Sequence, residues 1–176
     1  DELATLLRGH GVRVKVDKRD QLSPGFKFND WELKGACIRV EIGPRELEGG
    51  TCVVARRDFG EKVTVAFDQL ADYIHAQLDA MQHDLYARAL AFREANTFRV
   101  DTWEEFEACF AGEGGGGFVV AHWDGTDETE AIIAEKTKAT IRAIPMTPLH
   151  PDDVKPGKCV LTGRPSTQRV VFAKAY

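Results

Sequence analysis

Between residues 27 and 45 the chain gathers side chains of the types that proteins use to hold nucleotides. They are Lys27, Glu32, Lys34, Glu41 and Arg45. Lysine and arginine can contact phosphates and guanine edges, and glutamate can accept hydrogen bonds from base amino groups. The segment could therefore read the bases of a nucleic acid. On composition alone, the alternative is a set of solvated charges and weak helix-face ion pairs.

Other residues with reactive side chains lack the spacing of a catalytic site. Asp17, His10 and His75 might act as acids or bases, but none has a partner at a diagnostic distance along the chain. We therefore predict no catalytic residue in this chain.

The cysteines are too widely separated for a redox motif. No CxxC pair occurs, and we expect reduced thiols that are mostly buried as small hydrophobic groups, with a disulfide as the alternative. The four are Cys37, Cys52, Cys109 and Cys159.

The glycine run at residues 114–117 is a weak phosphate-binding signal. It lacks the Lys-Ser/Thr tail of a P-loop and follows no clear strand, so we predict a flexible turn.

Hydrophobic periodicity predicts the elements that must position these residues. Helices are expected at residues 2–9, at 26–33 and, for about 27 residues, from Asp68, and again after Thr102 and at 126–135. Strands are expected at residues 12–16, 38–42, 51–57, 62–67, 118–123, 140–144 and 169–173, with a hairpin turn at 58–61 and a proline-bearing loop at 145–156.

Composition sets broad limits. With 43% hydrophobic residues the chain can bury a core, and its formal charge of −5 still permits a local basic surface. No apolar run is long enough for a membrane span and no signal peptide is evident, so a cytoplasmic location without membrane contact is the default.

The order of the residues closely resembles prolyl-tRNA synthetase of the archaeal and eukaryote-like type. Residues 23–35 and 38–45 resemble its anticodon-binding domain, whereas 136–145 and 169–176 resemble its C-terminal zinc-binding-like domain. The resemblance covers practically the whole chain. It implies a class IIa α/β anticodon-binding domain, with a mixed sheet and helices, followed by a small α+β domain. The expected boundaries are 1–74 for the first domain, 75–97 for a connecting helix and 98–176 for the second.

The resemblance also implies a function. The chain would recognise the anticodon of proline tRNA, not DNA, and Lys27, Glu32, Lys34, Glu41, Arg45 and Arg19 would contact it. The parent aminoacyl-tRNA synthetase, a proline–tRNA ligase of protein biosynthesis and by its class a homodimer, would use ATP and Mg²⁺. No catalytic motif 2 or 3 is found, so this segment, read as the C-terminal part of a larger enzyme, should be inactive without its own catalytic domain and needs no cofactor itself. The alternative is a stand-alone RNA-binding or regulatory module derived from a synthetase.

Members of the family can hold zinc with four cysteines. The corresponding positions here are Asp124, Thr129, Cys159 and Thr162, so only one thiolate remains and zinc is not expected. A metal-dependent hydrolase using His122, Asp124 and Cys159 is a remote alternative. The family also implies that the carboxylate of Tyr176 can reach the catalytic domain, whereas fraying is the ordinary behaviour of a last residue.

Overall fold

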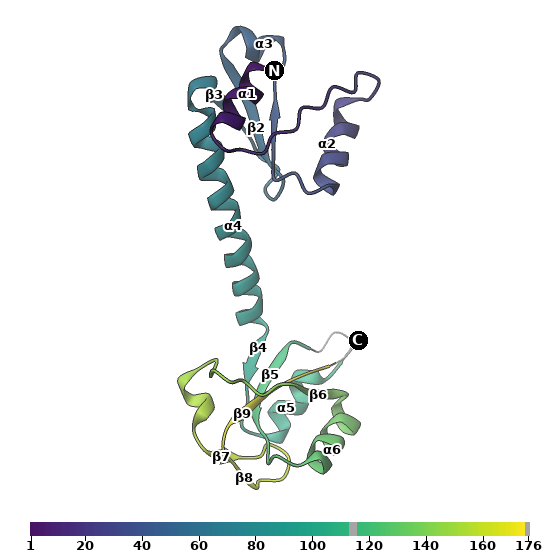
Figure 1. Cartoon of the computed structure of the whole chain (residues 1–176). Helices are drawn as coiled ribbons and strands as arrows, with labels where there is room; N and C mark the ends of the chain where they lie inside the picture. The colour runs from purple at the N-terminus through teal and green to yellow at the C-terminus, as the bar shows by residue number, and fades with distance from the viewer. Residues whose placement is uncertain (113–115, 175–176) are drawn as a thin grey trace. The chain divides into compact units, whose positions relative to one another are not determined.

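A computed structural model describes residues 1–112 and 116–174. The chain divides into two compact units, residues 1–88 and 89–176 (Figure 1). Both units combine helices with a sheet, which confirms the expected fold class. No helix within the described ranges is long and apolar enough to cross a bilayer.

The first unit contains a three-stranded antiparallel sheet in the order β1-β2-β3. Its elements are α1 (Glu2–Gly9), α2 (Pro24–Leu33), β1 (Ile38–Glu41), α3 (Pro44–Glu48), β2 (Thr51–Arg56), β3 (Lys62–Ala66), the 3₁₀ turn η1 (Phe67–Gln69) and α4 (Leu70–Ala95), whose last turns belong to the second unit.

The two faces of this sheet differ in chemistry. Cys52 and Val54 of β2 pack with Leu7 of α1 and Leu70 and Ile74 of α4 to form an apolar core. Because side chains alternate along a strand, the neighbouring positions point to the opposite face. The register places Arg39, Glu41 and Lys62 on that opposite face, which α2 adjoins (Figure 1). The sheet thus has an apolar side beneath α1 and α4 and a charged side beside α2.

The strand expected at residues 12–16 is wrong. Val12 and Val14 pack against the core as the alternation predicts, but the segment is extended without joining the sheet. A strand needs a neighbour for its backbone N–H and C=O groups, and within the described residues the ladder contains β1, β2 and β3 alone. The carbonyl of Val14 instead accepts a hydrogen bond from Arg8.

Helix α4 is buried along only part of its apolar stripe. Leu70, Ile74 and Met81 are buried, whereas Leu85 is 42% exposed and Phe92 is 72% exposed. Asp68, predicted as its N-cap, lies instead in the 3₁₀ turn that leads into the helix.

The second unit has a four-stranded mixed sheet in the order β4-β5-β9-β6, with β4 parallel to β5. Phe106, Phe110, Val119, Ile133 and Phe172 form the centre of its core. Its elements are β4 (Thr97–Arg99), α5 (Trp103–Phe110), β5 (Phe118–His122), α6 (Asp127–Thr137), β6 (Ala139–Ala143), the 3₁₀ turn η2 (Pro151–Val154), β7 (Gly157–Lys158), β8 (Pro165–Ser166) and β9 (Arg169–Lys174).

Most of the expected elements of this unit are present. Helix α5 begins after Thr102, as expected, where the Thr102 hydroxyl accepts the N–H of Glu105 and the Glu105 carboxylate accepts the N–H of Thr102. The proline-bearing loop contains η2, and the short strands β4, β7 and β8 were not predicted. Residues 114 and 115 of the glycine run, and Tyr176, lie outside the described residues.

Candidate functional site

Helix α2 lies beside the charged face of the sheet and carries several of the candidate residues. The Ser23 hydroxyl accepts the N–H of Phe26, and Pro24 occupies the first turn, where its missing N–H has no cost. Gly35, at φ +92°, ends the helical segment. No residue of α2 is fully buried, so polar contacts contribute much of the attachment of α2 to the rest of the first unit.

Arg39 links α2 to the sheet. One guanidinium nitrogen, Nη1, donates to Glu32 Oε1 at 2.5 Å, and Nε donates to Glu41 Oε1 at 2.9 Å. Lys62 Nζ donates to the other oxygen of Glu41 at 3.0 Å. The centroid of the Phe28 ring lies 4.0 Å from the Arg39 guanidinium carbon. Two carboxylates and two cations therefore form one compensated cluster on the charged face.

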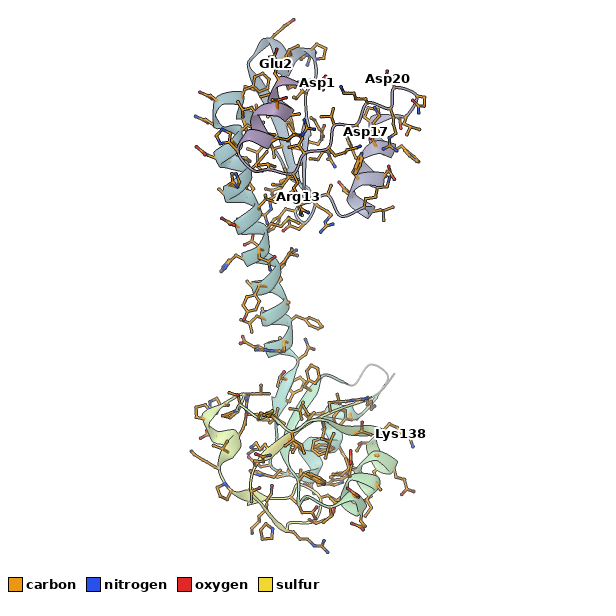
Figure 2. All side chains as sticks on the ribbon, in the orientation of Figure 1. Asp1, Glu2, Arg13, Asp17, Asp20 and Lys138 are labelled. Carbon is orange, nitrogen blue, oxygen red and sulfur yellow. The ribbon has the colours of Figure 1, made fainter. Side chains whose placement is uncertain are left out.

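A second network holds the same helix from the loop before it. The indole N–H of Trp31 donates to Asp17 Oδ2 at 2.8 Å, and Arg19 bonds both oxygens of Asp17. Figure 2 shows Asp17 beside α2. Asp30 accepts Arg19 and Lys34, each at 2.8 Å. Trp31 is thus half-buried and anchored by its N–H.

Neighbouring cations hold the pKa values of three carboxyl groups in these networks below their ordinary values. Burial alone would raise the pKa of Glu41, but hydrogen bonds from Lys62 and Arg39 outweigh it and leave the pKa below its ordinary value. The Arg19 guanidinium likewise holds the pKa of Asp17 well below its usual range. Lys34, followed by Arg19, lowers the pKa of Asp30. The carboxylates are therefore hydrogen-bond acceptors throughout the physiological range.

The structure distributes the six predicted site residues unequally. Glu32 and Glu41 meet on Arg39, whereas Arg19 and Lys34 meet on Asp30. The two remaining cations, Lys27 on α2 and Arg45 on α3, have no ion-pair partner in residues 1–112 and 116–174.

Sequence reasoning missed Phe28, Arg39 and Lys62 as members of the cluster. Arg39 alternates with the apolar Ile38 and Val40, a pattern that indicates a position on the polar side of a strand. That signal was available. The meeting of Lys62 with Glu41 depends on the pairing of β1, β2 and β3, which short-range patterns do not give.

The positions of the family's zinc ligands also come together, around a carboxylate. Asp124 Oδ2 accepts the hydroxyls of Thr129 and Thr162, each at 2.9 Å, and Oδ1 accepts the hydroxyl and N–H of Thr126 at 3.0 and 3.3 Å. The Asp124 side chain is 2% exposed. Cys159 is buried on the neighbouring turn, where its N–H donates to the carbonyl of Arg164.

These residues do not fit a zinc ion. Both oxygens of Asp124 are already bonded to hydroxyl or amide donors, and neutral threonine is a poor ligand. Among the described residues, no three histidine, cysteine or acidic side chains form a group able to hold a metal. Hydrogen bonds to Asp124 hold these residues together.

The remaining reactive side chains have structural partners. His75 Nε2 lies 2.9 Å from the carbonyl oxygen of His10. His122 is buried beside the Ser166 hydroxyl at 3.1 Å, and burial lowers the pKa of its imidazole. The four cysteines are free thiols.

Two protein-family models match this chain, one within each of the two compact units. The family described as "Anticodon binding domain" matches residues 1–77, and "Prolyl-tRNA synthetase, C-terminal" matches residues 103–176. The chain is 48% identical over 178 residues to the proline–tRNA ligase of Prosthecochloris aestuarii, covering 99% of this chain and 36% of the relative. The enzyme of Chlorobaculum tepidum gives the same values, and that of Cytophaga hutchinsonii is 49% identical over 170 residues, covering 97% and 33%. The chain thus spans about a third of the length of these curated relatives.

Proposed function

The chain matches the C-terminal portion of prolyl-tRNA synthetases, with residues 1–77 in the anticodon-binding domain family and 103–176 in the prolyl-tRNA synthetase C-terminal family, and from this premise we propose that it recognises the anticodon of proline tRNA. Residues 1–74 would do the recognition, 75–97 would connect, and 98–176 would form the C-terminal domain.

One observation carries the proposal: an acceptor and a donor stand side by side on the charged face. Arg39 Nη1 donates to Glu32 Oε1, while Glu32 Oε2 accepts no hydrogen bond and Arg39 Nη2 donates none among the described residues. The Watson–Crick edge of guanine offers N–H donors beside the O6 acceptor. Glu32 is therefore assigned to accept from the guanine N–H groups and Arg39 to donate to O6.

The other site residues would support this readout. Glu41 fixes Arg39 and Lys62 by accepting from both, and Arg19 and Lys34 fix α2 through Asp30. Lys27 and Arg45 would contact phosphates, because their charges are not compensated by ion pairs within the described chain. Bases of an anticodon loop can unstack, which exposes their edges to such groups.

The parent activity is proposed from the relatives, which are named as proline–tRNA ligases. The parent would use ATP and Mg²⁺ in a catalytic domain that pairs with this one, would work in the cytoplasm, and would form a homodimer. The terminal carboxylate of Tyr176 would face that catalytic domain.

The test is binding of the chain to two transcripts. Proline tRNA should bind more tightly than a variant whose two anticodon guanines are replaced. Glu32→Gln should reduce this discrimination by about 1 to 3 kcal/mol, because an NH₂ donor takes the place of the carboxylate oxygen that would accept from guanine while the remaining oxygen stays on Arg39. Equal affinity of the unaltered chain for both transcripts would refute the proposed readout.

Glu48→Gln supplies the matched control. Glu48 is an exposed carboxylate at the end of α3, so its loss removes the same charge without touching the Arg39 cluster. Discrimination should stay unchanged in this variant. A stand-alone module remains the second candidate, and the reading frame upstream of Asp1 in the gene distinguishes it from a synthetase segment.

A further inference from the structure

The turn between β2 and β3 exposes a large aromatic ring. Phe59 is 55% exposed and lies outside the apolar core of the first unit. Gly60 supplies the positive φ of +71° that the turn uses, so the turn itself does not require an aromatic neighbour. An exposed phenylalanine at this place therefore has no evident role in folding.

Arg56, which contacts the ring, is fixed by three acceptor side chains. Its Nε and Nη2 donate to the two oxygens of Asp58 at 3.0 and 2.7 Å, and Nη2 also reaches Asp84 of α4 at 2.8 Å. Its Nη1 donates to Gln77 at 3.3 Å. The Arg56 and Asp58 side chains are 12% and 5% exposed. The turn is thus held on α4, with both acids largely committed to an internal cation.

Two further cations border the turn and are much less committed. Arg88 is 52% exposed and has one ion pair among the described residues, at 3.2 Å, with an Asp58 oxygen that also accepts from Arg56. Arg57 is exposed and has no ion-pair partner among residues 1–112 and 116–174. The turn therefore combines an exposed aromatic ring with two cations that ion pairs compensate little or not at all.

The ring remains open to a stacking partner. The guanidinium carbons of Arg56 and Arg88 lie 4.7 and 5.4 Å from its centroid. Both guanidiniums bond the same Asp58 oxygen, at 2.7 and 3.2 Å, and Phe59 is nevertheless 55% exposed. This geometry leaves ring surface for a base, and the nearby cations favour a polyanion over an apolar partner.

We propose that this turn, residues 57–60 with Arg88, is a second RNA contact, in which Phe59 stacks on an unpaired base and Arg57 and Arg88 bind phosphates. The inference rests on the proposed function and adds to it a contact that contributes affinity without reading sequence. Base–aromatic stacking is tolerant of sequence because every base has a π face.

The experiment measures binding of the chain to proline tRNA and to the transcript with replaced anticodon guanines. Phe59→Ala should weaken both affinities by the same factor, roughly 5- to 100-fold, and Phe59→Trp should restore them. Arg57→Gln combined with Arg88→Gln should also weaken both equally. Phe92→Ala is the matched control, because Phe92 is a 72% exposed phenylalanine outside the turn and its loss should change nothing.

The outcomes separate this inference from the proposed function. If Phe59→Ala binds both transcripts as tightly as the unaltered chain does, and the unaltered chain discriminates guanine, the stacking contact alone is overturned. Loss of binding to the proline transcript only would make Phe59 a base reader and would also overturn it. If the unaltered chain binds neither transcript, both proposals are refuted. Circular dichroism of Phe59→Ala must match that of the parent, since a folding defect would instead assign Phe59 a structural role and contradict the inference.

Discussion

Replacing Asp124 by asparagine should destabilise the second unit, because its carboxylate accepts four hydrogen bonds from three threonines. An asparagine side chain has one oxygen, so whichever way the amide is turned, the two donors at the other position face an NH₂ group. Two bonds to an ionised oxygen contribute about 1.5 to 3 kcal/mol each, and rotated hydroxyls recover about 1 kcal/mol each as neutral bonds. The expected loss is about 1 to 4 kcal/mol.

Thermal and urea unfolding followed by tryptophan fluorescence would measure this loss, since Trp103 and Trp123 both belong to the second unit. For a unit of this size the expected loss lowers Tm by about 4 °C or more. Asp127→Asn is the control, because Asp127 is an exposed carboxylate in the first turn of α6 and its removal costs at most about 1 kcal/mol.

The pH dependence gives a second check. Burial alone would raise the pKa of Asp124, but the bonds from Thr162, Thr129 and Thr126 prevail and the pKa is lowered. A carboxyl group with a lowered folded-state pKa stabilises the fold above its unfolded pKa of about 3.9, and this contribution is lost as pH falls through the folded value. The difference in free energy of unfolding between the unaltered chain and Asp124→Asn should therefore become smaller as the pH falls. Equal stability at pH 7, or a difference independent of pH, would refute the reasoning.

Three further changes test the packing of the second unit by urea unfolding. Gly157→Ala should destabilise it by about 1 to 3 kcal/mol, because an added Cβ would lie 2.3 Å from His122 Nε2, and the penalty should shrink when His122→Ala is added. Thr102→Ala should cost about 1 kcal/mol through loss of the α5 cap, whereas Thr102→Ser should cost little; equal losses would reject the capping role. Arg99→Met should cost about 1 to 2 kcal/mol by leaving the buried Asp153 carboxylate without its cation, and Asp153→Asn should then recover stability; additive losses would contradict the coupling.

Local signals predicted much of the fold. The start of α5 after Thr102 was predicted, because a cap acts over three or four residues, whereas α2 begins at Pro24, two residues before the predicted start at residue 26. The segment at residues 12–16 shows where such signals stop. Its alternation is present in the structure, but a strand also requires a ladder partner, which is a property of distant residues.

The candidate site was predictable in composition and not in pairing. The sequence singled out Glu32 and Glu41 as charged groups near one another along the chain, yet it could not show that Arg39 joins them. Arg19 and Lys34 looked like free cations, and the structure pairs both with Asp30. Which charges remain uncompensated depends on tertiary contacts, and that property decides which residues are available to a ligand.

The balance of charge on the sheet beside α2 also bears on behaviour in different ionic strengths. Glu32 and Glu41 offset Arg39 and Lys62, so a nucleic acid docking there displaces few condensed counterions from its phosphates. Guanine discrimination by this cluster should therefore depend little on salt concentration, whereas overall affinity should fall with rising salt through the phosphate contacts proposed for Lys27, Arg45, Arg57 and Arg88.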